Sequence, residues 1–404
     1  MSRPRAGRSN RLSPMQFVVG FGVVSMLTDM VYEGARSITG PYLATLGASA
    51  ALVGLITGAG EAVALILRMV TGPLSDRIGR HWDQSMLGYA MTAVAAPLIA
   101  VTAALWSASV LIVVERFGKA VRTPARDTML AQASAGRRRG HVFAVHEALD
   151  QSGALLGPLL VATMVAVVGY RAGFAALAVP GALALLALLW LRRTVPMPGA
   201  YESSTVSAAA GAEQRGRLPA QFWRYAAFTA VAMAGSSTFA VLAFHMHERH
   251  VVADALIPVV YAAAMAAAAV AAIASGRLYD RVGTRALLIA LPLAAIVPTL
   301  AFTTSTALVV TGAVIWGASM GIHESTFRAV VAELVPPSRR GTGFGVFAAV
   351  YGVAWLGGSV LIGALYERSV PAVVGYTVLT QVIAGVMLLA MAGRPRFGET
   401  LPLG

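Results

Sequence analysis

Four charged side chains recur at helical spacing inside an otherwise apolar part of the chain. Glu115, Lys119, Arg122 and Arg126 stand at positions i, i+4, i+7 and i+11, so a helix over 113–130 carries them on one face. Lys119 is the only lysine in the protein. A charge at the centre of a bilayer costs about 2.5–3.5 kcal/mol even on a lenient insertion scale. The stripe must therefore face a water-filled pathway or acids on neighbouring helices, and its chemistry suits substrate binding or proton transfer.

Three other polar sets lie in apolar runs. They are Asp29, Glu33 and Arg36; Glu147 and Asp150; and His323, Glu324 and Arg328, the last two within pairing distance on a helix. A carboxylate away from water can bind or release a proton as its charged neighbours change, and histidine changes charge near neutral pH. The structural alternative for Asp29 is a permanent salt bridge to Lys119 or Arg116. For Glu61 and Arg68 we favour a structural lock.

The composition places these residues in a membrane. The chain has 404 residues, of which 57% are hydrophobic and 12% charged, whereas soluble chains carry about 25% charged residues. The net charge of +13 comes mostly from arginines in short loops, so it calls for no nucleic-acid partner. Without cysteine the chain has no disulfide, thiolate metal site or cysteine nucleophile. We expect an all-α integral membrane protein that begins with an uncleaved helix.

Twelve stretches are long and apolar enough to span a bilayer, which needs about 20 residues. The predicted spans are 14–44, 51–72, 84–104, 107–131, 140–167, 172–192, 220–247, 254–275, 285–304, 307–334, 341–366 and 370–392. With both ends in the cytoplasm, the inner segments hold 20 arginines and the outer loops hold three. This bias predicts a multi-pass protein of a bacterial-type cytoplasmic membrane with both termini inside.

The polar stretch 194–218 predicts a flexible cytoplasmic linker between two halves. We expect a tail at 1–13, six-helix bundles at 14–193 and 219–393, and a tail at 394–404. The loop sequence GPLSDRIGR at 72–80 returns as GRLYDRVGTR at 276–285. A second echo links 137–160 to 338–361 at nearly the same offset, about 200 residues. This pattern predicts a tandem duplication, the layout of a rocker-type transporter.

These loops resemble a signature of the major facilitator superfamily. The matching residues are Gly72, Asp76, Arg77, Gly79 and Arg80, with the second copy at Gly276, Asp280, Arg281 and Gly283. Gly153, Gly157 and Pro158 resemble the glycine–proline motif of its exporters, and ERFGKAVRTPARD resembles a bacterial exporter subgroup. The resemblance covers the whole chain. It implies two pseudo-symmetric bundles, with the first, fourth, seventh and tenth spans lining the cavity.

We therefore predict a secondary active transporter that works by alternating access, with proton-coupled efflux of a small organic compound or drug. The candidate proton carriers are Asp29, Glu33, Glu115, Glu147, Asp150, His323 and Glu324. The candidate substrate contacts are Arg36, Lys119, Arg122, Arg126, Asp127 and Arg328. The candidate gating residues are Gly72, Asp76, Arg77, Gly79, Arg80, Asp280, Arg281, Gly153, Gly157 and Pro158. For the loop motif the alternative is a simple topology signal.

Two other functions stay open. The first is transport of an organic anion held by Lys119, Arg122 and Arg126, because arginine binds carboxylates and phosphates in bidentate fashion. The second is a lipid flippase or an intramembrane enzyme, although no nucleophile–base set is readable. The run HMHERH at 245–250 predicts interfacial, solvated histidines and no metal site. We expect no cofactor and no ATP-driven step, and we expect a monomer whose partners are protons, a small molecule and membrane lipid.

Overall fold

The structure is a computed structural model that describes residues 10–133, 139–201, 218–336 and 339–392, all of them helical or in connecting turns. The α-helices are α1 (Pro14–Thr45), α2 (Ala50–Ile66), α3 (Arg68–Ile78), α4 (His81–Leu98), α5 (Leu105–Ala133), α6 (Arg139–Val167), α7 (Tyr170–Ala176), α8 (Ala178–Thr194), α9 (Ala220–Ala234), α10 (Phe239–Glu248), α11 (Ile257–Val282), α12 (Ala290–Ala301), α13 (Thr306–Leu334), α14 (Arg340–Arg368) and α15 (Val370–Ala392). Short 3-10 helices η1 (Ile99–Val101), η2 (Pro198–Tyr201), η4 (Asp254–Leu256) and η5 (Gly283–Ile289) join some of them. Residues 1–9 of the predicted N-terminal tail, the predicted C-terminal tail and most of the predicted linker 194–218 lie outside the described residues.

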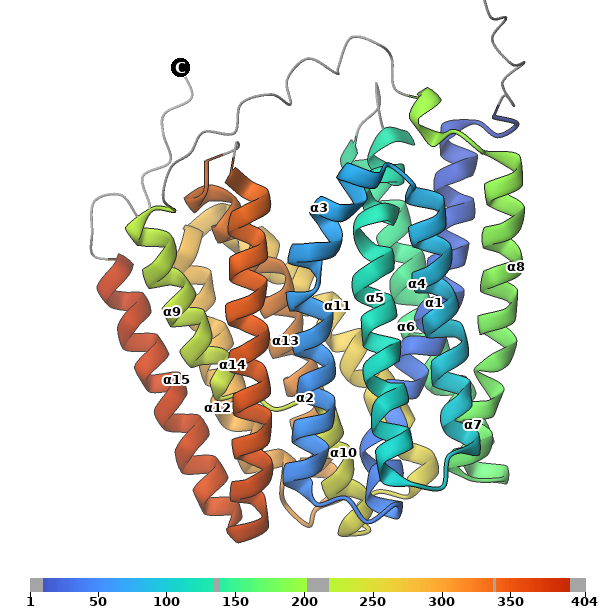
Figure 1. Cartoon of the computed structure of the whole chain (residues 1–404). Helices are drawn as coiled ribbons and strands as arrows, with labels where there is room; N and C mark the ends of the chain where they lie inside the picture. Colours follow the sequence, from blue (N-terminus) through green and yellow to red (C-terminus); the bar gives the residue numbers. More distant parts are fainter. Residues whose placement is uncertain (1–9, 134–138, 202–217, 337–338, 393–404) are drawn as a thin grey trace, which may run out of the picture.

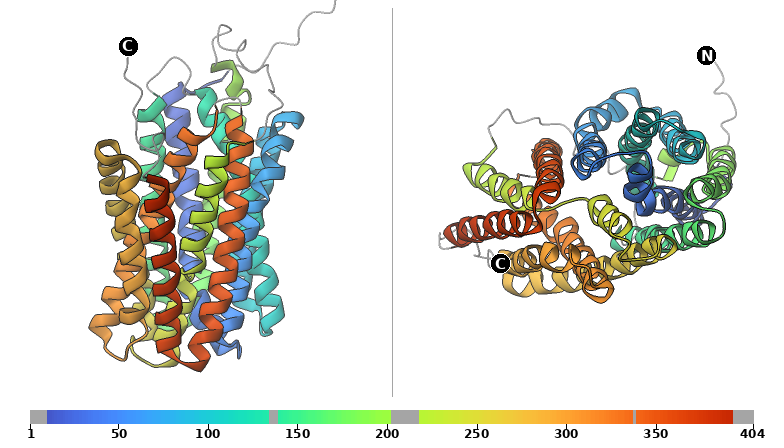
Figure 2. Two further views of the ribbon diagram at one scale, coloured as in Figure 1. Left: turned by 90° about the vertical axis from the view of Figure 1, so that its left-hand side faces the viewer. Right: turned by 90° about the horizontal axis from the view of Figure 1, so that it is seen from below.

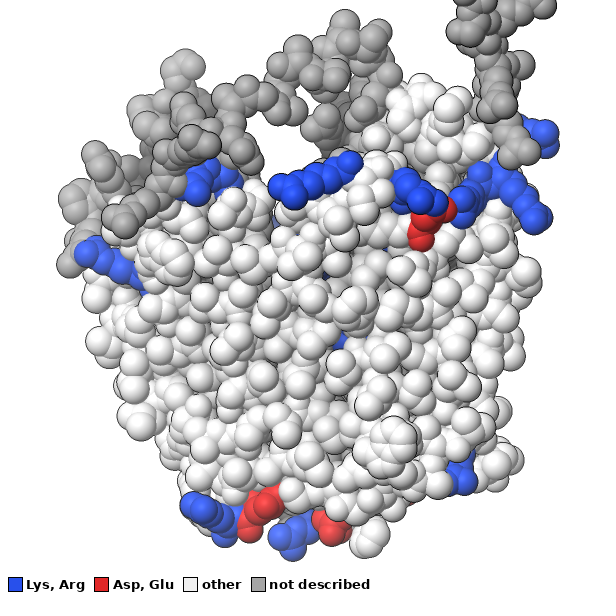
Figure 3. All heavy atoms as spheres, viewed as in Figure 1, with Lys and Arg blue, Asp and Glu red and all other residues white. Residues whose placement is uncertain are grey.

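The outer surface is apolar along the length of the helices. In the face seen in Figure 3, charged side chains gather at the two ends and leave a broad uncharged band between them. Large hydrophobic side chains such as Trp106, Val179 and Val386 are exposed on this surface. Within the described residues, ten helical segments are long and apolar enough to cross a membrane. These observations define a multi-pass membrane protein, in agreement with the composition.

Most helix bounds follow the predicted spans, and the differences have local causes. The span expected at 51–72 is divided between α2 and α3, and α3 continues to Ile78. The span expected at 220–247 is interrupted between α9 and α10, at residues 235–238. That interruption reads Gly-Ser-Ser-Thr, residue types that favour helix ends over helix interiors. The charged helix α5 runs unbroken through Pro124 and is not among the ten apolar segments.

The helices form two groups that lie side by side. Helices α1–α8, here called the N-terminal group, and α9–α15, the C-terminal group, occupy opposite sides of the molecule in Figures 1 and 2. Helix α1 begins, and α15 ends, at the upper end in Figure 1. The groups touch chiefly where α2 packs on α14, α1 on α10, and α6 on α11. Toward the lower end, the Ala51 amide of α2 donates a 2.8 Å hydrogen bond to Glu367 Oε1 of α14.

Glycines permit the closest approaches between helices. A Cβ added at Gly40 would collide with the backbone of Ala240, and one at Gly54 would collide with that of Ser359. Within the N-terminal group, Gly153 and Gly157 bring α6 against the backbone of α1 in the same way. The glycines of the exporter-like motif therefore pack two helices of one group together, which is a structural task compatible with bending at Pro158.

We predict that Gly54→Ala lowers the free energy of unfolding by about 1–3 kcal/mol, because the new methyl group must push α2 away from α14. Unfolding of the purified protein in detergent measures this change. The matched control is Gly357→Ala on α14, where an added Cβ meets open space. Equal stability of the two variants would contradict the close α2–α14 contact.

Candidate functional site

An ion-pair network centred on Glu61 lies inside the N-terminal group. Glu61 Oε1 lies 3.3 Å from Arg36 Nη2 and 3.7 Å from Arg116 Nη2. Arg36 Nη1 also lies 3.6 Å from Glu33 Oε2, and Arg116 Nε lies 3.5 Å from Glu115 Oε2. The five side chains are all buried, with at most 12% exposed. Glu61 thereby joins α2 to α1 and α5 by charge.

The expected lock between Glu61 and Arg68 is wrong. Helix α2 ends at Ile66 and α3 begins at Arg68, so the two residues no longer share a regular helical face. Among the described residues, no ion pair joins them, and Glu61 is taken by Arg36 and Arg116.

The ring of Tyr32 forms a platform for two cations of α5. The Lys119 Nζ atom lies 3.5 Å, and the Arg116 guanidinium carbon 4.0 Å, from the ring centroid. In the described part of the chain Lys119 has no carboxylate within salt-bridge distance, so the ring is the partner that the structure shows. Cation–π contacts of this kind reach about 2 kcal/mol when desolvated. Lys119 is therefore held by an aromatic face, which leaves its ammonium hydrogens free for another acceptor.

A second part of the charged stripe pairs with acids of α1 and α6. Arg122 Nη2 lies 3.2 Å from Asp29 Oδ1, so Asp29 pairs with Arg122 and not with Lys119 or Arg116. Arg122 also stacks 4.8 Å from the Tyr89 ring centroid. Its side chain is 2% exposed, yet its Nε and Nη1 atoms have no hydrogen-bond partner among the described residues. Buried donors without partners are rare in folded proteins, so Arg122 retains unused binding capacity.

The last cation of the stripe, Arg126, completes the link to α6. Arg126 Nε lies 2.9 Å from Asp127 Oδ1, and Nη1 lies 3.7 Å from Asp150 Oδ2. Asp150 thus balances part of the charge of this arginine. Glu147 is exposed and receives a 2.9 Å hydrogen bond from Gln151, so it lies apart from the buried network.

Three further polar residues, none of them a candidate from the sequence, join the N-terminal network. Ser25 Oγ lies 2.9 Å from His146 Nε2 and 3.1 Å from the Tyr89 hydroxyl. All three are buried. Ser25 and Tyr89 lie in mainly apolar surroundings, as ordinary packing residues do, whereas His146 directly precedes Glu147 and belongs to the same polar stretch.

One hydrogen bond connects the network to the C-terminal group. The Tyr261 hydroxyl of α11 donates to Glu33 Oε2 of α1. Beside it, the Arg36 guanidinium carbon lies 5.9 Å from the ring centroid of Trp355 on α14. Tyr261 is fully buried and its ring packs on Phe239. The network of one group therefore reaches its neighbour through a carboxylate and a cation on the same helix face.

The polar residues of α13 do not join the network in this structure. Glu324 and Arg328 are exposed and form no ion pair with one another in the described part of the chain, so their expected pairing is not present. His323 is buried against Phe327, with ring centroids 4.6 Å apart. Neither ring nitrogen of His323 has a partner among the residues described.

The histidine-rich run at 245–250 differs from expectation at its first position. His245 is buried, with Nδ1 2.8 Å from the Tyr366 hydroxyl and Nε2 2.8 Å from the Thr303 carbonyl. His247 pairs with Asp254 at 2.7 Å. Only the later part of the run is solvated, since α10 turns its first histidine toward the interior. No group of three or more metal-ligating side chains occurs among the described residues.

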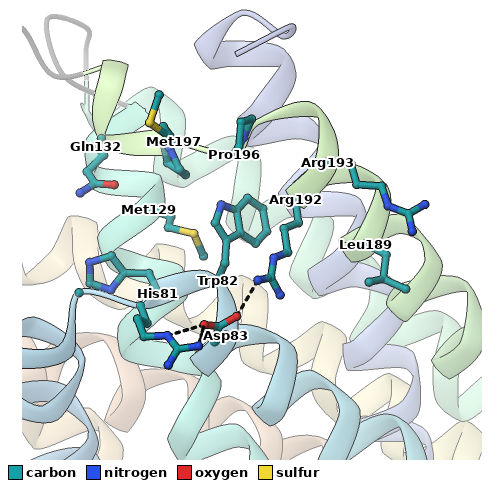
Figure 4. A pocket seen from close by; sticks show the side chains of 14 residues that line it. His81, Trp82, Asp83, Met129, Gln132, Leu189, Arg192, Arg193, Pro196 and Met197 are labelled. Carbon is teal, nitrogen blue, oxygen red and sulfur yellow. Dashed lines mark hydrogen bonds and ion pairs between the residues drawn. The ribbon is translucent and has the colours of Figure 1, made fainter. Parts of the chain in front are cut away.

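The loop motif forms a sharp turn with a surface ion-pair cluster. Gly79 and Gly283, its counterpart, both have left-handed φ angles, 63° and 61°, which explains glycine at each turn. After the turn, Asp83 bridges Arg80 Nη2 at 2.6 Å and Arg192 Nη2 at 2.7 Å (Figure 4). These residues line a recess of about 700 Å³ between α4, α5 and α8.

The other candidate gating charges of the two loop copies are Asp76, Arg77, Asp280 and Arg281. The side chain of Asp76 lies outside the described part of the structure. Arg77, Asp280 and Arg281 are exposed at the ends of α3 and α11.

The chain belongs to the Major Facilitator Superfamily, whose sequence profile matches residues 21–359. An uncharacterized protein of Mycobacterium tuberculosis is 50% identical over 383 residues, covering 94% of each chain. A bacterial homolog of the human lysosomal transporter Spinster, in an inward-facing and occupied conformation, has the same fold at 17% identity, with a TM-score of 0.70 and coverage of 93% and 96%. A peptide transporter in complex with sulfate is similar at 14% identity, with a TM-score of 0.75 and coverage of 95% of each chain. The protein is thus a membrane transporter of a family that is not enzymatic.

We predict that Arg122→Leu lowers the free energy of unfolding by about 3–5 kcal/mol, because it leaves Asp29 as an unpaired buried charge. The double variant Asp29→Asn, Arg122→Leu should recover part of this loss. Denaturant unfolding in detergent measures both. Arg192→Leu is the control, since its pair with Asp83 is partly exposed and such pairs contribute only about 0–1 kcal/mol. A double variant no more stable than Arg122→Leu would contradict the pairing.

Proposed function

We propose that the protein is a secondary active transporter that couples proton movement to efflux of a small organic compound by alternating access. Family membership supports transport of a small molecule across a membrane. The proposal includes twelve spans in two six-helix halves and both termini in the cytoplasm. The positions of α1, α5, α9–α10 and α13 suit the cavity-lining role that the family resemblance implies for the spans at these positions.

The observation that carries the proposal is the hydrogen bond from Tyr261 to Glu33. Glu33 also pairs with Arg36, so one carboxylate belongs both to the buried network and to the contact between the two groups. A charged carboxylate is a stronger acceptor than a protonated one. Protonation of Glu33 would therefore weaken its bonds to Tyr261 and Arg36 together, and would favour separation of α1 from α11.

Protonation of Glu33 would change the ion pairs of its neighbours in the network. Loss of charge at Glu33 leaves Arg36 with Glu61 as its remaining carboxylate, and Glu61 is shared with Arg116. The rearrangement can pass from there to Glu115 and the charged stripe of α5. Asp29 and Asp150, each paired with an arginine of that stripe, are the other candidate carriers within this group. Glu147, His323 and Glu324 stay candidates for another conformation of the cycle.

The loop motifs serve as gates in this proposal. Gly79 and Gly283 set turns at the end where the chain termini lie, and Arg80 ties the first turn to α8 through Asp83 and Arg192. Breaking such exposed pairs costs little, so they can open and close in each cycle. Asp76 and Arg77, with Asp280 and Arg281 in the second copy, would act in the same way.

We predict that Glu33→Gln abolishes transport driven by a pH gradient but retains exchange of substrate across the membrane. Proteoliposomes with an imposed gradient, tested with a panel of radiolabelled organic anions and cationic dyes, measure both activities. Gradient-driven accumulation should fall by about tenfold or more, which corresponds to about 1.4 kcal/mol. Tyr261→Phe should share the defect in part, because it removes the same hydrogen bond from the other side.

The control for this experiment is Tyr225→Phe. Its buried hydroxyl donates to the Phe327 carbonyl inside the C-terminal group, 3.2 Å away, and touches no acid of the network. Unchanged gradient-driven transport in Glu33→Gln would remove this residue from the coupling role, whatever Tyr261→Phe does.

A second candidate function is transport of an organic anion. Unused donors on cations of α5 favour it: Nε and Nη1 of Arg122, Nη1 of Arg116, and the ammonium of Lys119, which the structure shows only against Tyr32. Hydrogen bonds to charged groups contribute about 1.5–3 kcal/mol each. A carboxylate or phosphate between α1 and α5 would satisfy these donors without breaking the pairs already present. A lipid flippase is a third possibility, and none of the contacts described above favours it in particular.

We predict that Lys119→Ala weakens binding of anionic compounds by about tenfold or more, as expected from loss of one charge-assisted hydrogen bond. Lys119→Arg should keep part of the affinity but slow the transport cycle, because an arginine stays charged throughout whereas a lysine can release its proton when it is desolvated. Ligand-induced shifts in melting temperature, followed by uptake assays, measure these effects. The exposed Arg249→Ala is the control. Wild-type affinity and rate in both Lys119 variants would leave this lysine with a structural role only.

A further inference from the structure

A small pocket with a mainly apolar lining and a few hydroxyl groups lies in the C-terminal group beside the interruption between α9 and α10. Its cavity volume is about 20 Å³, which is room for a single water molecule or small ion. Gly235, Ser236 and Ser237 of the interruption line one side, while Ser319 of α13 and Thr377 of α15 line the others. The four hydroxyl-bearing residues are all buried. Figure 1 shows α9 and α10 as separate helical segments, and α9 packs on α14.

The pocket gathers oxygen atoms that the protein itself does not satisfy. Neither Ser319 Oγ nor Thr377 Oγ1 has a hydrogen-bond partner among the described residues. Pro298 of α12 also lines the pocket, and its missing N–H leaves the carbonyl of Ala294, another lining residue, without its usual helical donor. Buried hydroxyls and carbonyls of this kind need an external partner.

The local field favours a positive partner. Helix α9 ends at Ala234, immediately before the lining residues, and the carboxyl end of a helix carries a partial negative charge. The lining contains no carboxylate, histidine or cationic side chain. Oxygen ligands suit hard cations, while the lack of carboxylates disfavours Mg²⁺ and Ca²⁺, which are usually bound with at least one. Interrupted helices with free carbonyls are used in other transporters to coordinate Na⁺. Here the carbonyls of Ala234 and Ser237 accept hydrogen bonds from Tyr376 and Trp316. The carbonyls without a donor among the described residues are therefore those of Gly235 and Ser236.

We propose that this pocket binds one Na⁺ ion through the hydroxyls of Ser319 and Thr377 and the backbone oxygens of Gly235 and Ser236 at the α9–α10 interruption. The ion would stabilise the interruption at residues 235–238 and thereby the position of Thr238. The Thr238 backbone amide donates to Ser359 Oγ of α14 at 3.2 Å, and its hydroxyl lies 2.7 Å from Thr57 Oγ1 of the N-terminal group. Sodium would thus bind next to a contact between the two groups. The proposal does not depend on proton coupling at Glu33.

The test measures melting of the purified protein in NaCl, KCl and choline chloride at equal ionic strength and pH, together with binding of radioactive ²²Na⁺. Sodium should raise the melting temperature by about 3 °C or more with saturation, as expected for a ligand that binds only the folded state. One ²²Na⁺ should bind per chain and exchange with unlabelled Na⁺ but poorly with K⁺. The double variant Ser319→Ala, Thr377→Val should lose both effects.

Thr229→Val is the matched control, because its buried hydroxyl on α9 already donates to the Tyr225 carbonyl at 3.0 Å and is remote from the pocket lining. It should retain the sodium effect. Equal melting of the wild type in all three salts, with no retained ²²Na⁺, would overturn the proposal and leave the pocket to water. If the double variant fails to fold, the wild-type ²²Na⁺ measurement still decides.

Discussion

The structure depends on one constraint, which is that charged side chains inside an apolar bundle must find partners within it. Helix α5 carries a stripe of such charges and could not be inserted stably facing lipid. Helices α1, α2 and α6 supply acids that form ion pairs with these charges. Glu61 of α2 pairs with two arginines, Arg36 and Arg116. The arrangement of the N-terminal group therefore follows from charge as much as from apolar packing. Removing a single partner is expected to be costly, whereas exchanging partners is not.

Exchange of partners is also what a transport cycle requires. Some cations of the network could take a further partner. Lys119 rests on an aromatic ring, and Nε and Nη1 of Arg122 have no hydrogen-bond partner among the described residues. It also extends past its own group, since Glu33 accepts a hydrogen bond from Tyr261. Rigid packing surrounds this link: glycines on α1 and α2 press against backbone of α10 and α14. A change of charge at Glu33 would act where the two groups otherwise meet through close helix packing and through the hydrogen bonds of Ala51 to Glu367 and of Thr57 to Thr238.

Much of the fold could be predicted from the sequence because apolar length and glycine turns are local properties. The helix bounds, the turns at Gly79 and Gly283, and the charged face of α5 all follow from neighbouring residues. The partners could not be predicted, since they depend on which faces meet in three dimensions. The structural alternative for Asp29 named Lys119 or Arg116 as its partner, but Asp29 pairs with Arg122. The lock expected between Glu61 and Arg68 is replaced by pairs of Glu61 with Arg36 and Arg116. Tyr261 gave no signal, because a single tyrosine in an alanine-rich run is usual for a packing residue.

The central claim is that the charge on Glu33 controls contact between the two groups, and a distance measurement tests it without knowledge of the substrate. The chain has no cysteine, so spin labels can be placed on Val101→Cys and Leu308→Cys, two exposed sites at the end opposite the termini. Pulsed electron paramagnetic resonance then gives their separation in the otherwise wild-type protein and in Glu33→Gln. We expect one short separation with Glu33 in place and an added population of longer separations in Glu33→Gln, in which the side chain cannot carry the charge. An identical distance distribution in the two proteins would contradict the account.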